Sequence, residues 1–165
     1  MPDQSPALFE EYNPSRPEIP RDCITITGSR DVDPAKLLAV VPEALASFRG
    51  KNRHWLLGGA IGVDDHVTQW LLGHEERVTG VVPFLKENQP ASVQETLAGL
   101  NGGCYELALP KTKKAYLDRN SFMVDHSQVV IAFWNGEKGG TWQTIQYALK
   151  NGKETHVYPV TGSVR

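Results

Sequence analysis

The sequence lacks the features that would mark a nucleic-acid-binding, secreted or membrane protein at first sight. Its 17 Lys and Arg against 19 Asp and Glu leave a net charge of -2, which argues against nucleic acid as the main partner because phosphate backbones are usually bound by a basic surplus. The start, Met1-Pro2-Asp3-Gln4, has no basic or apolar region of a signal peptide. No apolar run approaches the roughly 18 residues of a membrane span. We therefore expect a cytoplasmic protein with no membrane partner.

Cysteine is also scarce, and the histidines are scattered. Cys23 and Cys104 lie far apart, in no metal-binding or redox spacing, which suits reduced thiols in a cytosolic core. The chain has no His-x-x-x-His and no Cys-x-x-Cys pair. The pattern therefore predicts no metal site.

Prolines gather in the first 21 residues, where they forbid a continuous helix and favour an extended arm. Leu8, Phe9 and Tyr12 lie close together in this segment and could pack against another surface. Two interpretations stay open: a loose tail, or an arm that packs on the domain or on a second subunit. We expect an arm over residues 1–21 and a single domain over 22–165.

After the arm, short β-rich runs alternate with helical periodicities. Strands are expected at 23–27, 55–57, 78–84, 105–109, 129–133 and 155–160, and helices begin near 34, 63, 90, 113 and 141. Strands this apolar, separated by helices, indicate a parallel sheet covered on both faces. The expected fold is α/β: a three-layer, Rossmann-like, doubly wound and mainly parallel sheet.

Ligands of such sheets bind at the carboxyl ends of the strands, near the point where the strand order reverses. Three loops with glycine follow predicted strands there: Gly28-Ser29-Arg30-Asp31, Gly58-Gly59-Ala60-Ile61-Gly62-Val63-Asp64-Asp65 and Asn135-Gly136-Glu137-Lys138-Gly139-Gly140-Thr141. Glycine lets a backbone approach a ligand closely, and amides at a helix N-terminus bind anions. Each loop alone also fits an ordinary tight turn. Their coincidence on one edge favours a phosphate site, although neither the GxGxxG nor the P-loop spacing is present.

Together with Arg119-Asn120 in a predicted helix, the order of these loops resembles the SLOG superfamily over about residues 24–160. That group includes Smf/DprA DNA-processing proteins, LOG phosphoribohydrolases (lysine-decarboxylase-like), molybdenum-cofactor carriers and the YspA- and YpsA-related families. In size and in its first two turns the chain is most similar to the YspA-related families. The resemblance implies a nucleotide or nucleotide-derived ligand and a homo-oligomer, dimeric or larger.

The first hypothesis is a sensor or carrier that binds a phosphorylated, nucleotide-like small molecule. Arg30 and Arg119 would neutralise the phosphate, and Asp64 or Asp65 would bind a ribose hydroxyl. The candidate ligand-binding residues are Gly28, Ser29, Arg30, Gly58, Gly59, Ala60, Gly62, Asp64, Arg119, Asn120, Gly139, Gly140 and Thr141.

Two other functions stay open. LOG enzymes carry a glutamate at the position that Thr144 occupies here. An N-glycosidic hydrolase would therefore need Asp64, Asp65 or Glu137 in place of that glutamate, together with Arg119. A Smf/DprA-like single-stranded DNA binder is disfavoured because no basic stripe with interleaved aromatic residues is present. Trp134 and Trp142 flank the third loop and fit either the core or a platform for a base.

Overall fold

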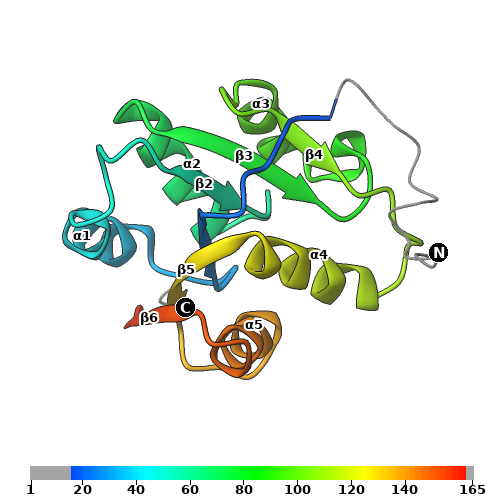
Figure 1. Cartoon of the computed structure of the whole chain (residues 1–165). Helices are drawn as coiled ribbons and strands as arrows, with labels where there is room; N and C mark the ends of the chain where they lie inside the picture. Colours follow the sequence, from blue (N-terminus) through cyan, green and yellow to red (C-terminus); the bar gives the residue numbers. More distant parts are fainter. Residues whose placement is uncertain (1–15, 163–165) are drawn as a thin grey trace.

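The computed structural model describes residues 16–162, in which strands and helices alternate along the chain (Figure 1). Leu8, Phe9 and Tyr12 of the predicted arm lie outside the described residues. The strands are β1 (Cys23–Gly28), β2 (His54–Leu57), β3 (Arg77–Val82), β4 (Cys104–Glu106), β5 (Ser127–Trp134) and β6 (Glu154–Pro159). The helices are α1 (Pro34–Leu45), α2 (Val63–Gly73), the 3-10 turn η2 (Lys86–Asn88), α3 (Ala91–Ala98), α4 (Lys114–Asp125) and α5 (Gly140–Lys150).

The six strands form one sheet in the order β4-β3-β2-β1-β5-β6, and every neighbouring pair is parallel. The chain first builds outward from β1 to β4 and then returns to the other side of β1 with β5. The strand order therefore reverses between β1 and β5, which pair with Ile26 opposite Ile131. The predicted doubly wound α/β fold is confirmed, and its sheet is parallel throughout.

Helices cover both faces of the sheet, because alternate residues of each strand point to opposite sides. Trp55 and Leu57 of β2 pack in a cluster with residues of α1 and α2, whereas Leu56 between them packs with Met123 of α4. On this second face α4 and α5 lie side by side (Figure 1). Ala148 of α5 packs with residues of α4 and β5 there.

Two predicted strands end earlier than the sequence suggested. The third stops at Val82, and the next residue is Pro83, which has no amide hydrogen to continue the ladder. The fourth stops at Glu106 rather than Leu109, because Ala108 takes a φ of 52° and the Leu109 amide turns to the Pro83 carbonyl. The first bend leads the chain into η2 and α3, and the second leads it to α4.

The described part of the proline-rich segment packs along the edge of the sheet. Arg16 donates to the Glu106 carbonyl at 2.9 Å, and its guanidinium lies 4.9 Å from the ring centroid of Tyr105. Ile19 packs against the cluster that contains Cys23 and Leu56. Residues 16–21 therefore cover part of β4, the strand at one edge of the sheet.

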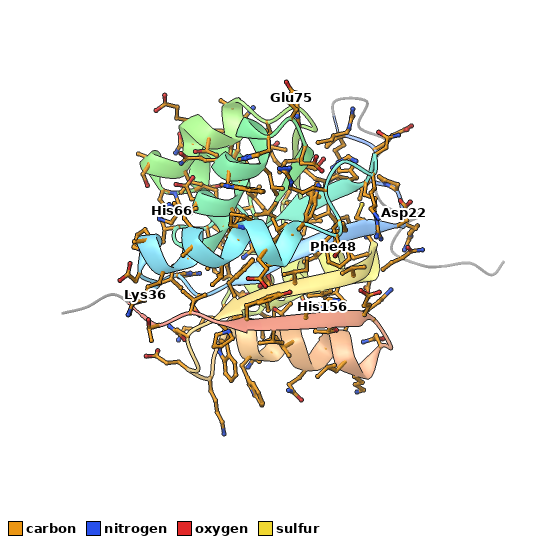
Figure 2. The ribbon with its side chains drawn as sticks, turned by 90° about the vertical axis from the view of Figure 1, so that its left-hand side faces the viewer. Asp22, Lys36, Phe48, His66, Glu75 and His156 are labelled. Carbon is orange, nitrogen blue, oxygen red and sulfur yellow. The ribbon has the colours of Figure 1, made fainter. Side chains whose placement is uncertain are left out.

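The two ends of the sheet are distinguished in Figure 2. Lys36, in the first turn of α1, lies toward the carboxyl ends of the strands. Asp22 lies at their amino ends, just before β1. The loops that follow β1, β2 and β5 share the Lys36 edge. The fold thus gathers the three glycine-containing loops as the sequence predicts.

Candidate functional site

A cleft of about 600 Å³ opens at the carboxyl edge of the sheet, where the loops after β1 and β5 meet α4. Its size falls within the range of small-molecule sites, roughly 300–1,000 Å³. It is lined by Thr27, Gly28, Ser29, Arg30, Asp31, Ala60, Asp64, Lys113, Tyr116, Leu117, Arg119, Asn120, Asn135, Glu137, Lys138, Gly139, Gly140 and Thr141. Most of the predicted binding residues therefore share one cleft, and it lies at the predicted reversal of strand order.

The first two loops are locked to each other by close backbone packing. The Val63 amide donates to the Ser29 carbonyl at 3.2 Å. A Cβ on Gly62, which has a φ of +82°, would lie 2.3 Å from the Arg30 carbonyl oxygen, and one on Gly28 would lie 2.5 Å from the Val63 side chain. Glycine is required at positions 28 and 62 because the first and second loops pack too closely for a Cβ at either one.

In the second loop, the chain's own carboxylate occupies the place of an anion. Asp64, 8% exposed, accepts a hydrogen bond from the Ala60 amide at 3.2 Å. Burial raises the pKa of Asp64 to about 6, against the opposing effects of the Arg119 guanidinium and of the loop amides. Gly58 and Gly59 do not line the cleft. The Asp64 carboxylate is thus already held by the backbone of Gly58 and Ala60.

The buried side chain of Arg119 supports the second loop through hydrogen bonds. Its Nη1 donates to the carbonyls of Gly58 and Val81, which joins α4 to the ends of β2 and β3. Burial lowers its pKa, and nearby Asp64 opposes that change. A Cβ on Gly58 would lie 2.7 Å from Arg119 Nη1 and 2.9 Å from Asp64 Oδ2. Glycine at position 58 therefore leaves the room that both buried charges need.

The structure places Asp65 away from the cleft. Its carboxylate accepts hydrogen bonds from Thr96 at 2.9 Å and from Gln69 at 3.0 Å. Of the three candidate catalytic residues, Asp64 and Arg119 are thus brought together, and Asp65 faces α3. Thr144, at the position of the LOG glutamate, donates its hydroxyl to the Gly140 carbonyl at 2.8 Å.

The third loop leaves the N-terminus of α5 open toward the cleft. No described side chain caps this helix, and the hydrogen bonds among residues 16–162 leave the amides of Gly140 and Thr141 unused. Asn120 approaches this terminus: its Nδ2 lies 3.9 Å from the position of a Cβ on Gly140. Arg119 Nε donates to Asn120 Oδ1 at 2.7 Å, so the amide group of Asn120 is held with its donor free.

The loops after β1 and β5 are also joined to each other. Ser29 Oγ accepts from the Asn135 amide at 3.0 Å, and Asn135 Nδ2 donates to the Asp31 carbonyl at 3.1 Å. The Ser29 hydroxyl, predicted to contact the ligand, therefore first serves to hold the third loop in place.

The sequence predicted Asn120 as a site residue of α4, but it did not predict the three cleft residues that share its helical face. Lys113, Tyr116, Leu117 and Asn120 all line the cleft, and they follow the i, i+3, i+4, i+7 spacing of one helical face. That spacing was the available signal. Trp134 and Trp142 instead stack on each other, with ring centroids 5.2 Å apart, and neither lines the cleft.

The charges of the cleft favour an anion slightly. Four cationic side chains line it (Arg30, Lys113, Arg119 and Lys138), against three acidic ones (Asp31, Asp64 and Glu137). Within residues 16–162, no group of three or more His, Cys, Asp or Glu is placed to hold a metal ion. No helix in this part of the chain is long and apolar enough to cross a membrane.

Known families and proteins share this architecture. The family described as "DNA recombination-mediator protein A" matches residues 1–164. Over 144 residues the chain is 26% identical to the uncharacterized SPbeta prophage-derived protein YoqJ of Bacillus subtilis (strain 168). This match covers 70% of this chain and 79% of YoqJ.

Solved structures of three further proteins have a similar fold. DNA processing protein A from Streptococcus pneumoniae superposes with a TM-score of 0.65 and 16% identity over 87% of this chain and 51% of that one. DNA processing protein A from Helicobacter pylori, described for its single-stranded DNA binding mode, superposes with a TM-score of 0.65 and 23% identity. The match covers 84% of this chain and 65% of that one. The molybdenum cofactor binding protein of Rippkaea orientalis superposes with a TM-score of 0.61 and 22% identity, and the match covers 82% of this chain and 75% of that one. The chain thus spans about half to two thirds of the DNA processing proteins.

Proposed function

The chain belongs to the DNA recombination-mediator protein A family, and on that premise we propose that its cleft binds a phosphorylated, nucleotide-like small molecule, as a sensor or carrier. The phosphate is held at the N-terminus of α5. The observation that carries this proposal is the uncapped start of that helix, with the amides of Gly140 and Thr141 unused and directed to a cleft. Such a terminus combines free N–H donors with the positive end of the helix dipole.

The starts of α1 and α2, which also lie at this edge, support the choice of α5 by contrast. At α1, Asp33 caps the helix by accepting from the Ala35 amide at 3.0 Å. Before α2, Asp64 accepts from Ala60, and the Val63 amide donates to Ser29. A phosphate near α2 would also meet the carboxylate of Asp64, which would repel it. Among these three starts, α5 is the one whose first amide, that of Gly140, has no partner within the described residues.

Side chains around α5 complete a site for an anion. Asn120 Nδ2 offers a donor fixed by the bond between Arg119 and Asn120 Oδ1. Thr141 adds a hydroxyl, and Lys113, Lys138 and Arg30 add positive charge along the cleft. Hydrogen bonds from charged or oriented donors to a phosphate are about twice as strong as neutral ones.

Binding is proposed in preference to hydrolysis because the cleft offers no accessible carboxylate at the position of the LOG glutamate. Thr144 occupies that position and bonds to the backbone, Asp65 faces α3, and Asp64 and Arg119 are both buried in contacts that hold the second loop. A group committed to the loop is poorly placed to activate water.

The first experiment is saturation-transfer NMR on the purified protein with nucleoside mono- and diphosphates, ADP-ribose and NAD, followed by calorimetric titration of the best ligand. We expect transfer to the ligand without new free-ribose signals. Asn120→Asp keeps an oxygen for Arg119 but directs a negative charge at the phosphate, so affinity should fall at least about tenfold.

Lys150→Gln is the matched control for that variant. It also lowers the net charge by one, but it lies in the last turn of α5, away from the cleft. It should bind as the wild type does. Equal affinity in Asn120→Asp and wild type, or no binding across the whole panel, would overturn the proposed site; new free-ribose signals would indicate a hydrolase.

Single-stranded DNA is a second candidate, favoured by one surface feature. Lys111, Lys113 and Lys114 are exposed together where the chain enters α4, and Lys113 lines the cleft. The Helicobacter pylori relative is described as binding single-stranded DNA. Fluorescence polarisation with a labelled oligothymidylate distinguishes the two: DNA binding predicts an affinity that falls steeply with salt and is lost when the three lysines become alanine.

Self-association is a further part of the proposal. The SLOG resemblance implies a dimer or a larger homo-oligomer, and β6 offers an edge of the sheet that no described strand covers. Light scattering on a sizing column measures the mass directly. A monomer at the concentrations used for binding would refute this part while leaving the ligand site untouched.

A further inference from the structure

Three side chains connect the second loop to the start of α5. The carboxylate of Asp64 and the guanidinium of Arg119 meet where a Cβ on Gly58 would lie, at 2.9 Å from Asp64 Oδ2 and 2.7 Å from Arg119 Nη1. On its other side, Arg119 Nε donates to Asn120 Oδ1 at 2.7 Å, and the Asn120 amide group approaches Gly140. All three side chains line the cleft. A buried cation therefore lies between a buried carboxylate and the proposed phosphate site.

Within residues 16–162, the charged side chains that act on the Asp64 carboxyl from neighbouring elements are both cationic. Arg119 reaches it from α4, and Arg30 reaches it from the loop after β1. On its own loop, the Ala60 amide donates to it at 3.2 Å. The next carboxylate of α2, that of Asp65, is turned to α3. Because Arg30 and Arg119 also line the cleft, the two cations that stabilise ionised Asp64 are cations that a bound anion would approach.

An ionised Asp64 and a bound anion therefore compete for the same two arginines. Burial raises the pKa of Asp64 to about 6, so this carboxyl gains or loses its proton near neutral pH. When Asp64 is ionised, its charge offsets part of the positive potential of the arginines and repels an incoming anion. When Asp64 is protonated, both arginine charges remain available to the anion. Such effects extend over several ångströms in a partly buried cleft, where the effective dielectric constant is low.

From this shared use of two arginines we infer that the cleft takes up a proton together with its anion, and that Asp64 is the group that binds the proton. The inference rests on the proposed function and adds its regulation: the anion is held more tightly in acidic than in alkaline solution. Linkage makes the effect reciprocal, so the bound anion raises the pKa of Asp64 by the factor by which protonation tightens binding.

The test uses sulfate as the anion, because it stays doubly charged from pH 5 to pH 7.5, whereas a phosphate group itself gains a proton near pH 6. The wild-type chain is titrated with sulfate at both pH values and constant ionic strength, and NMR follows the amides of Gly140 and Thr141. Raising the pKa of Asp64 by about 1 corresponds to a coupling of about tenfold. Most of that coupling falls inside this window, so the dissociation constant for sulfate should rise at least about fivefold from pH 5 to pH 7.5.

Two matched variants assign the pH dependence to one carboxyl. Asp64→Asn keeps an oxygen for the Ala60 amide but cannot titrate, so its dissociation constants at the two pH values should be nearly equal. Asp65→Asn makes the same change on the next residue, outside the cleft, and should keep the wild-type ratio. Each ratio compares one variant with itself, so a general loss of affinity does not enter. The five histidines of the chain titrate in both variants and do not distinguish them.

A second measurement needs no variant. The carbon-13 shift of the Asp64 carboxyl, followed against pH in the wild-type chain, should report a pKa that is higher by about 1 in saturating sulfate than in chloride of equal ionic strength. If sulfate binds equally at both pH values, or leaves the pKa of Asp64 unchanged, the inference is overturned and the phosphate site stands. If sulfate binds at neither pH, the inference is also overturned, and the nucleotide panel described above decides separately whether the phosphate site stands.

Discussion

The contact between the first two loops can be tested at Gly62. This residue has a φ of 82° and a ψ of -129°, a backbone conformation that is essentially confined to glycine. A Cβ there would lie 2.3 Å from the Arg30 carbonyl oxygen and 2.7 Å from two more Arg30 backbone atoms. No side-chain rotation relieves these contacts, because every neighbour belongs to the backbone.

The cost of Gly62→Ala follows from two separate effects. Holding a residue other than glycine in such a region costs about 1–3 kcal/mol, and pushing packed loops apart costs about a further 1–3 kcal/mol. We therefore expect the free energy of unfolding to fall by roughly 4 kcal/mol, a large part of the about 5–15 kcal/mol of an ordinary domain. Ligand affinity should fall too, because Arg30 is the residue displaced.

Urea unfolding at 25 °C, followed by tryptophan fluorescence, measures this loss. Two other glycines serve as controls. Gly50 has a φ of +70° but open space around its Cβ position, and Gly73 has open space and no positive φ. Gly50→Ala should lower the free energy of unfolding by about 1 kcal/mol, from backbone strain alone, and Gly73→Ala should not lower it. The packing argument fails if Gly62→Ala loses no more stability than Gly50→Ala.

Three further predictions concern buried groups. The pKa of Asp64 is raised to about 6 from 3.8, so the unfolded chain releases this proton at lower pH than the folded one. Relative to Asp64→Asn, wild-type stability should therefore fall by roughly 2.5 kcal/mol between pH 4 and pH 7, which urea unfolding at each pH measures. Arg119→Met should cost about 3–5 kcal/mol because it leaves Asp64 without its cation, and adding Asp64→Asn should restore part of that loss in a double-mutant cycle. Burial raises the pKa of Cys23 to about 12 and that of Cys104 to about 11, so Ellman's reagent should label both thiols slowly until urea unfolds the chain; a thiol that reacts within seconds in native buffer would contradict this.

The sequence predicted the order and type of the elements because both follow from local patterns. Buried strands such as β5 read as continuous apolar runs, and Asp33-Pro34 marks the start of a helix in the way that capping chemistry requires. The ends of strands were predicted less well. The turn at Ala108 depends on a bond between the Leu109 amide and the Pro83 carbonyl, and no local pattern announces a contact between segments that far apart.

The candidate site shows the same division. Its three loops could be predicted because each follows a strand and contains glycine. The roles within them could not: Asp64 turns inward to Ala60, Asp65 turns outward to Thr96, and only the packing of α2 against α3 separates these two adjacent carboxylates. Tyr116 was missed because its exposure depends on where α4 lies relative to the first loop.

The residues that carry the superfamily resemblance are largely those that build the cleft. Gly58, Gly62, Asp64 and Arg119 are engaged with one another or with backbone groups beneath the surface. Of the groups left free to meet a ligand, Lys113, Tyr116 and Leu117 stand outside the shared motifs, whereas Asn120 and the start of α5 belong to them. A motif of this kind fixes the shape of the cleft without choosing its occupant, so proteins that share it can bind different molecules. We infer that substitutions of these four buried motif residues lower stability and affinity together, whereas substitutions at Tyr116 or Asn120, which face the cleft, change affinity alone. Measuring both quantities for each variant tests that separation, and a stable Arg119→Met protein that had lost only its ligand would refute it.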